Sequence, residues 1–214
     1  MSTRELPTPV GTARLHLEGA GRLLVLGHGA GGGVSAPDLL AARAAGLDAG
    51  LCVVRVEQPW RVRGRRVAEA APRLDAAWLA VLAHLAPEHG RPLVVGGRSS
   101  GARVACRTAT ATGAAGVLCL AFPLHPPGRP GTDRGAELAL PGVPRLVVQG
   151  ERDPFGVPAA GRGIAVQVVR GADHAFAVRR TDGRSAGEVR AEVQAVVAVW
   201  LSDLVASGPA QRLT

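Results

Sequence analysis

The sequence predicts an α/β fold in which a mainly parallel, doubly wound β-sheet carries helices on both faces. Apolar runs of strand length alternate with amphipathic runs of helix length along the whole chain, which is typical of βαβ units. The chain has 214 residues, of which 47% are hydrophobic. This is enough for one compact core and leaves little for a second. We therefore expect a single domain over residues 1–214, with its core between about residues 9 and 205.

The first predicted strands lie near the N-terminus. Arg14–Leu17 alternates polar and apolar residues, a glycine-containing turn follows, and Leu23–Leu26 is an apolar run. We expect these two segments to form an antiparallel edge hairpin that leads into a central strand. Further strands of the buried type are expected at Leu51–Val56, Pro92–Gly96, Val117–Phe122, Arg145–Gln149 and Ile164–Val169.

Helices of crossover length are predicted between the strands. They are expected at Pro37–Ala45, Arg73–Leu85, Ser100–Thr110 and Ala186–Val205. The segment from Pro123 to Arg145 is rich in proline and glycine, so it has room for at most one short helix, around Asp133–Leu138. No cap domain is expected over the sheet.

The charge of the chain is strongly basic, with a formal net charge of +8 and a pI near 11.3. All of the basic residues are arginine, which is typical of a GC-rich genome, and they are scattered. The densest cluster, Arg61–Arg66, has only Trp60 as an aromatic neighbour, unlike the stacking surfaces of single-strand binders. We expect no nucleic-acid partner.

The three cysteines lie in apolar runs without the spacing of a metal site, which indicates buried, reduced thiols. The N-terminus lacks the apolar core of a signal peptide, and no stretch reaches the roughly 18 uninterrupted apolar residues of a membrane span. A cytoplasmic protein with no membrane partner is expected.

A nucleophile elbow is predicted at Gly97–Gly101, which reads Gly-Arg-Ser-Ser-Gly. It follows a buried strand and precedes a helix, the context in which a G-x-S-x-G motif presents a serine at the end of a sheet. The glycines are required because a Cβ at either position would clash in so sharp a turn. A second match surrounds Ser185 but follows a polar run, so we expect Ser185 in the first turn of the last helix.

A glycine-rich loop, Gly27–Gly33, follows the strand that contains Leu23–Leu26. It suits an oxyanion hole, whose predicted donors are the backbone N–H groups of Ala30 and Ser100. The same loop matches the dinucleotide fingerprint G-x-G-x-x-G, with Glu57 as a ribose ligand. That alternative leaves the elbow at Ser99 and the later acidic and histidine residues unexplained.

Asp153 and His174 each follow a predicted strand, and parallel strands end at the same edge of a sheet. The order Ser99, Asp153, His174 is the order of a catalytic triad on such a sheet, with His174 as base and Asp153 as its orienting acid. Asp173 is a rival acid, but consecutive side chains diverge. We expect Asp153.

Substrate contacts are expected close to these residues. Arg98 lies inside the elbow, where an arginine would favour anionic acyl groups. The other candidates for substrate binding are His28, Gly29, Trp60 and His125.

The segments LVLGHGAGG, VEQPWRVRGRR, GGRSSGARVA, FPLHPPGRP, QGERDPFG and GADHAF together resemble a small α/β-hydrolase family. This family includes testis-expressed protein 30 and the hydrolase-like domain of the third subunit of the non-specific-lethal chromatin complex. The resemblance covers about residues 9–204 and implies a minimal α/β-hydrolase fold without a cap. Trp60 and its neighbours depart from the aromatic-rich segment of the relatives, which affects the shape of the pocket.

Two functions follow from these patterns. The first is a serine hydrolase that cleaves a small-molecule acyl substrate, an ester, thioester or related acyl bond, through an acyl-serine intermediate and with no metal or organic cofactor. The alternative is a protein-interaction module on a hydrolase scaffold. The intact Ser99, Asp153 and His174 favour the enzyme.

Overall fold

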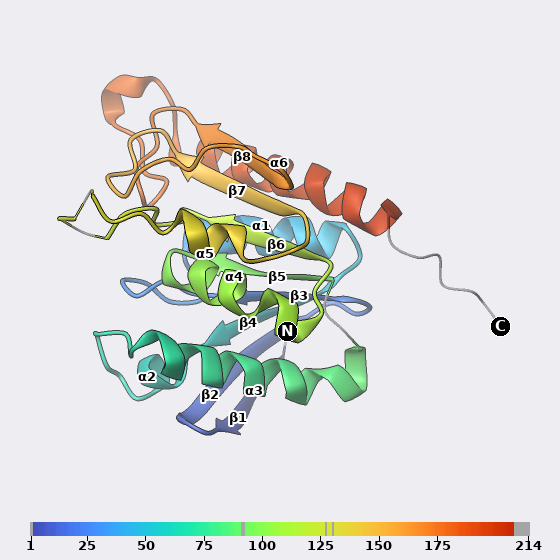
Figure 1. Cartoon of the computed structure of the whole chain (residues 1–214). Coiled ribbons are helices and arrows are strands. Elements are labelled where there is room, and N and C mark those ends of the chain that lie inside the picture. The colour runs from blue at the N-terminus through green and yellow to red at the C-terminus, as the bar shows by residue number, and fades with distance from the viewer. Residues whose placement is uncertain (1, 91–92, 127, 130, 208–214) are drawn as a thin grey trace.

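The computed structural model describes residues 2–90, 93–126, 128–129 and 131–207. It contains one eight-stranded sheet, with strand order β1-β2-β4-β3-β5-β6-β7-β8 (Figure 1). Strands β3 to β8 are parallel, and β1 and β2 are antiparallel at one edge. The bounds are β1 Ser2–Thr8, β2 Gly11–Glu18, β3 Leu23–Gly27, β4 Cys52–Glu57, β5 Val94–Arg98, β6 Gly116–Leu120, β7 Arg145–Gly150 and β8 Ile164–Val169. The predicted α/β fold with a mainly parallel sheet is confirmed.

The prediction that Arg14–Leu17 and Leu23–Leu26 pair as a hairpin was wrong. β2 pairs with β1 on one side and with β4 on the other, and β3 lies between β4 and β5. The first strand was missed because its residues are mostly exposed polar ones, which carry no hydrophobic alternation. Pro92, the first residue of the predicted strand Pro92–Gly96, lies outside the described residues.

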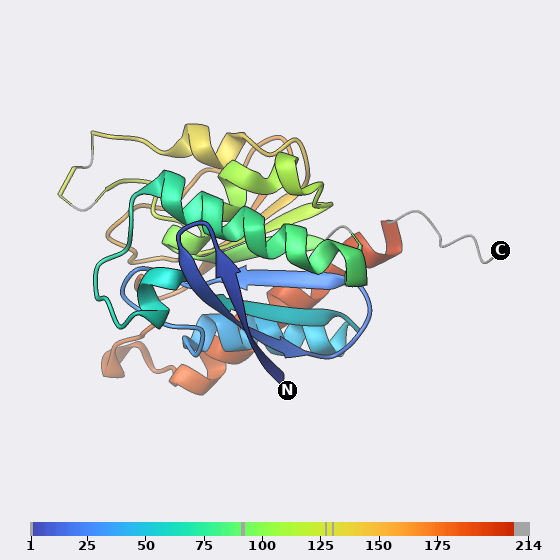
Figure 2. The ribbon, with the colours of Figure 1, turned by 90° about the horizontal axis from the view of Figure 1, so that it is seen from below.

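The helices cover both faces of the sheet (Figures 1 and 2). α1 (Pro37–Asp48) and α6 (Ala186–Ser207) pack side by side on one face. α3 (Ala71–His89) and α4 (Ser100–Thr112) cover the other. Two short helices, α2 (Pro59–Val62) and α5 (Gly135–Ala139), and the turn η1 (Arg180–Asp182) lie in the connections.

The core is divided by the sheet into two apolar layers. In β3, Leu24 and Leu26 face α1 and α6, and Leu23 and Val25 face α3 and α4, because side chains alternate along a strand. Burial of each such side chain contributes roughly 1.5–3 kcal/mol. α6 packs against the sheet through buried apolar side chains spaced four residues apart: Val189, Val193, Val197 and Leu201.

β8 has the predicted bounds but not the predicted burial. It is an edge strand whose residues are mostly exposed or half-buried. Its apolar composition is typical of a central strand. The sequence alone does not indicate that β8 lies at the edge of the sheet. The three cysteines are buried and free, as expected.

The connection between β6 and β7 contains α5 as the only helix among its described residues. Arg103 of α4 donates two hydrogen bonds to Glu137 of α5, at 2.6 and 2.7 Å. α5 is thereby held beside α4 at the flank of the sheet. In the described part of the chain, no helix is both long and apolar enough to span a membrane.

Candidate active site

The elbow is a backbone turn between β5 and α4. Ser99 is the residue between them, with φ 53° and ψ −113°. A residue with a Cβ in this region costs about 1–3 kcal/mol, so the surrounding structure must hold it there. The Ser99 N–H donates to the carbonyl of Leu120 at the end of β6, at 2.9 Å. The hydroxyl therefore stands at the carboxyl edge of the sheet.

A side chain at either glycine of the elbow would clash with the backbone of β3, and one at Gly97 would also clash with the backbone of Gly101. A Cβ on Gly97 or on Gly101 would lie 2.4 Å from the carbonyl oxygen of Gly27. No Cβ tolerates such an approach to backbone. The Gly97 Cβ would also lie 2.9 Å from the carbonyl carbon of Gly101. The elbow thus packs backbone against backbone on the neighbouring strand.

Ser99, His174 and Asp153 form a continuous chain of hydrogen bonds. His174 Nε2 lies 3.1 Å from Ser99 Oγ, and His174 Nδ1 lies 2.7 Å from Asp153 Oδ2. The Asp153 side chain is fully buried. With the proton on Nδ1 donated to the carboxylate, Nε2 is left to accept the proton of the serine hydroxyl.

Asp153 is held by two further donors. Gln149 Nε2 donates to Asp153 Oδ2 at 2.7 Å, and the Phe155 N–H donates to Oδ1 at 2.9 Å. Gln149 also donates to the carbonyls of Phe122 and Gly156. All of its contacts are acceptors, which fixes its amide orientation. Gln149 is not among the residues that the sequence predicts for the site; the signal for it is a polar side chain at the buried end of a strand, β7.

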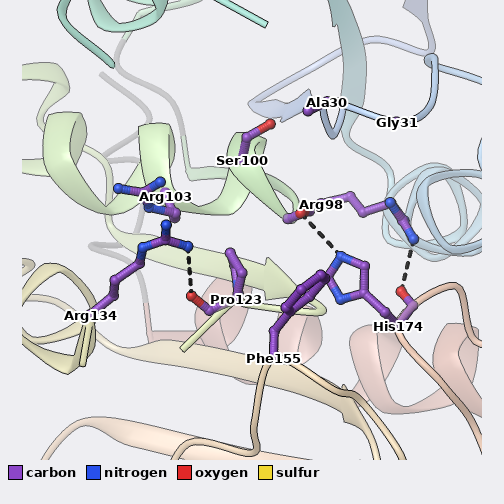
Figure 3. Close-up of a pocket in the computed structure, with 10 residues that line it drawn as sticks. Ala30, Gly31, Arg98, Ser100, Arg103, Pro123, Arg134, Phe155 and His174 are labelled. Carbon is purple, nitrogen blue, oxygen red and sulfur yellow. Dashed lines mark hydrogen bonds between the residues drawn. The ribbon is translucent and has the colours of Figure 1, made fainter. Parts of the chain in front are cut away.

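The predicted oxyanion donors lie beside Ser99. Ser100 is the first residue of α4, so its N–H has no partner within the helix. Ala30 lines the same cavity from the glycine loop (Figure 3). A Cβ on Gly29 would be tightly packed, 3.1 Å from Arg98 Nη1 and 3.2 Å from Ser99 Cβ. A Cβ on Gly31, Gly32 or Gly33 would meet nothing within 4 Å.

A cavity of about 460 Å³ opens next to Ser99. Phe155 forms one wall and meets the His174 ring edge to face, with ring centroids 4.5 Å apart. The cavity is lined by Ala30, Gly31, Arg98, Ser99, Ser100, Arg103, Pro123, Arg134, Phe155 and His174 (Figure 3).

Arg98 lines this cavity, but its guanidinium is already engaged by the protein. Its Nε lies 2.9 Å from the buried carboxylate of Asp38, at the start of α1, and its Nη2 donates to the His174 carbonyl at 2.8 Å. Burial raises the pKa of Asp38, and the charge of Arg98 opposes this shift. Arg98 therefore fastens the His174 loop to α1, and its charge is balanced.

His28 and Trp60 do not line the cavity, contrary to expectation. Both are buried, and their rings meet edge to face at 5.4 Å. His28 donates from Nδ1 to the Gly29 carbonyl at 2.8 Å and accepts the Gln58 N–H at Nε2, at 3.0 Å. They join the glycine loop to the end of β4. The sequence does not distinguish the two cases, because a side chain just past the end of a strand points inward as readily as outward.

Replacing His28 with alanine is expected to lower the free energy of unfolding by about 2–4 kcal/mol, because two buried backbone groups lose their partner. Burial lowers the pKa of His28, so the unfolded chain binds this proton at a higher pH than the native state does. The stabilisation is present above the unfolded value of about 6.5 and declines as the pH falls below it.

Denaturant melts of the wild type and of His28→Ala at pH 7.5 and 5.5 measure this loss. The exposed His84 of α3 supplies the control variant His84→Ala, which is expected to melt like the wild type. A His28→Ala variant with wild-type stability at pH 7.5 would contradict the assignment.

His125 also lies outside the cavity lining. Its Nδ1 bonds to the Thr132 carbonyl at 3.0 Å, and its N–H donates to the Phe155 carbonyl at 2.9 Å. A Cβ on Gly156 would lie 2.8 Å from the His125 ring. His125 packs behind the Asp153 loop and supports Phe155 from outside.

Ser185 and Asp173, the alternatives to Ser99 and Asp153, lie where they cannot take part in the chain of hydrogen bonds. Ser185 caps α6: its hydroxyl accepts the Glu188 N–H at 3.2 Å, and the Glu188 carboxylate accepts the Ser185 N–H. Asp173 accepts the N–H groups of Ala175 and Ala177 at 2.8 and 2.9 Å. Neither contacts His174 through its side chain in the described structure.

The dinucleotide interpretation of the glycine loop was wrong. A dinucleotide site needs the glycine loop to open a helix directly, whereas α1 begins only at Pro37. The alternative's ribose ligand, Glu57, forms an ion pair with Arg14 at 3.2 Å, and its carboxylate lies 3.8 Å from His16 Nε2.

Residues 20–202 match the model of a protein family described as "Alpha/beta hydrolase domain". No curated protein matches the chain. An α/β serine hydrolase homologue from Coxiella burnetii is similar in structure, with a TM-score of 0.69, 18% identity and coverage of 91% of this chain and 96% of that one. A serine hydrolase without a lid from Xanthomonas campestris is similar as well, with a TM-score of 0.70, 19% identity and coverage of 93% of this chain and 94% of that one. For Est1E from Butyrivibrio proteoclasticus, the TM-score is 0.71, with 11% identity and coverage of 97% of this chain and 100% of that one. Est1E has also been solved with ferulic acid bound. The family match spans most of the chain and the sheet has the same fold, so the chain belongs to the α/β-hydrolase family.

Proposed function

We propose that the chain, as a single domain, is a serine hydrolase that cleaves small esters or thioesters through an acyl-serine intermediate. The observation that carries this proposal is the hydrogen-bonded chain from Ser99 through His174 to the buried Asp153, at the wall of a cavity of about 460 Å³. The strained Ser99 backbone supports it further, since strain of this kind is retained at reactive positions. The finer kinship with testis-expressed protein 30 is part of the same proposal.

The chemistry proceeds in two steps. His174 Nε2 takes the proton of Ser99 as Oγ bonds to the substrate carbonyl carbon, and the oxyanion accepts hydrogen bonds from the Ala30 and Ser100 N–H groups. As this intermediate collapses, the bond to the leaving oxygen or sulfur breaks and His174 returns its proton to the leaving group. Water, activated by His174, then attacks the acyl-serine and releases the acid.

Asp153 serves this cycle by holding the proton on Nδ1 and by stabilising the imidazolium that forms in each step. Gln149 positions Asp153. Arg98 positions the His174 loop through its carbonyl. No metal or organic cofactor has a part in these steps, because nucleophile, base and electrostatic stabilisation all come from the chain itself.

Short acyl chains are expected to be preferred. The cavity has a volume of about 460 Å³, and Arg103 holds the short helix α5 beside α4. We expect kcat/KM for 4-nitrophenyl acetate and butyrate to exceed that for the decanoate at least tenfold, below the solubility limit of each ester. A preference for long chains that arises only above that limit would contradict the open site. Absence of turnover on every ester and thioester in the series would contradict the proposed function.

A further inference from the structure

Two arginines line the cavity on the side away from His174. Arg103 comes from α4, one turn beyond the nucleophile, and Arg134 comes from the residue before α5 (Figure 3). Phe155, Pro123 and Ala30 make much of the remaining wall apolar. A cavity that needed only to hold an alkyl chain would gain nothing from cations at its end.

The two arginines differ in their partners. Arg103 is bidentate on Glu137, and Arg107 behind it is bidentate on Asp75, at 2.8 and 2.6 Å, and also reaches Glu137 at 3.3 Å. Arg134 forms no ion pair with any carboxylate in the described part of the chain. Its one side-chain hydrogen bond runs from Nη1 to the Pro123 carbonyl at 3.3 Å. Arg103 and Arg107 thus take up both carboxylates, Glu137 and Asp75, and Arg134 contacts neither.

Of the three arginines, Arg134 alone has no carboxylate in direct contact among the described residues. This side chain is half-buried, and burial lowers its pKa; the positive charge of Arg103 acts in the same direction, and the more distant carboxylate of Glu137 opposes the shift. A guanidinium nevertheless stays protonated at neutral pH. Four of its five N–H donors are free of protein partners in the described structure. Such a fork is suited to two parallel hydrogen bonds from a carboxylate.

The direction of the reaction places the acyl chain toward Arg134. The leaving group takes its proton from His174 Nε2 and must therefore lie on the His174 side of Ser99. Arg103 and Arg134 lie on the other side of the cavity (Figure 3). A chain that extends from the acyl carbon away from His174 runs between Pro123 and Arg103 toward the Arg134 guanidinium.

We propose that Arg134 binds a carboxylate at the far end of the acyl chain, so that the preferred substrates are half-esters of short dicarboxylic acids. This assignment rests on the proposed function and names its substrate class. Arg134 takes no part in bond making or breaking: the acyl-serine forms and is hydrolysed as above, and the distal carboxylate stays bound throughout. The products are the alcohol and the free dicarboxylate.

The test compares two esters of equal chain length, the mono-4-nitrophenyl ester of glutaric acid and 4-nitrophenyl pentanoate, in which a methyl group replaces the carboxylate. We expect kcat/KM of the wild type to be at least tenfold higher for the glutarate. Arg134→Gln is expected to lose at least ten times more activity on the glutarate than on the pentanoate, and Arg134→Lys to lie between. Half-esters of succinic and adipic acid then identify the best chain length.

The exposed Arg129, which lies in the same connection and outside the cavity lining, supplies the matched control Arg129→Gln. This variant is expected to keep the wild-type preference. Thermal melts verify that each variant is folded. Equal loss on both esters in Arg134→Gln, or hydrolysis of pentanoate without a preference for any half-ester, would overturn the role of Arg134 and leave the proposed function standing. Absence of hydrolysis of every ester, together with an unlabelled Ser99, would overturn both.

Discussion

Ser99→Ala is expected to lower kcat by about 10⁵-fold or more and to abolish labelling by a fluorophosphonate. No other side chain in the cavity lining offers an oxygen in contact with a base, since Ser99 Oγ alone meets His174 Nε2 in the described structure. The fold should persist. Alanine keeps the Cβ and hence the backbone strain at φ 53°, so its stability should match the wild type within about 0.5 kcal/mol.

Ser99→Gly separates the reactive role of this position from its strain. Glycine removes the hydroxyl and also relieves the left-handed backbone, so this variant should be equally inactive and more stable than the wild type by about 1 kcal/mol. Ser185→Ala is the matched control. It loses the α6 cap and about 1 kcal/mol of stability but keeps its activity. Full labelling of Ser99→Ala with loss of labelling in Ser185→Ala would assign the nucleophile to Ser185.

Asp153→Asn is expected to lower kcat/KM by about 10³–10⁴-fold. Three donors converge on this carboxylate: His174 Nδ1–H and Gln149 Nε2 on Oδ2, and the Phe155 N–H on Oδ1. An asparagine must turn its NH₂ group toward one of these two positions, where it meets a donor. The variant therefore loses the proton placement on His174 or the loop contact to Phe155, and also about 1–3 kcal/mol of stability.

Asp173→Asn is the control for charge near His174. Its Oδ1 accepts the N–H groups of Ala175 and Ala177, and an asparagine oxygen can accept both. We expect kcat/KM within threefold of the wild type. The steady-state kinetics of the two variants on one short ester settle the choice of acid, and the opposite ranking would place Asp173 in the site.

The candidate site followed from the sequence where local chemistry was specific. The elbow requires glycine on both sides of Ser99, and loops after buried parallel strands meet at one edge, so Asp153 and His174 were predictable as neighbours of the serine. Their catalytic role stays a prediction. The four long helices and α5 agreed with prediction to within a few residues because the strands and turns that bound them are well marked, whereas the short α2 was not predicted.

The remaining features depend on contacts between distant segments. Arg98 resembles a ligand for anions in the sequence, but its charge is taken up by Asp38, 60 positions earlier in the chain. Arg134 attracted no attention, because only the pairing of Arg103 and Arg107 with Glu137 and Asp75 leaves it unpaired. In a chain with so many arginines, a single sequence does not tell a compensated charge from a free one.

The contact of Gly97 and Gly101 with the Gly27 carbonyl bears on how the chain folds. These residues are brought together only when β3 and β5 pair across the whole β4 and α3 segment, a long loop closure. Until that pairing forms, nothing in the elbow peptide itself compensates the left-handed conformation of Ser99, and α4 can form without it. The backbone conformation of Ser99 is thus a product of non-local assembly. If Ser99 is the nucleophile, as proposed, a partly folded chain with native helix content would hold an ordinary, unreactive serine.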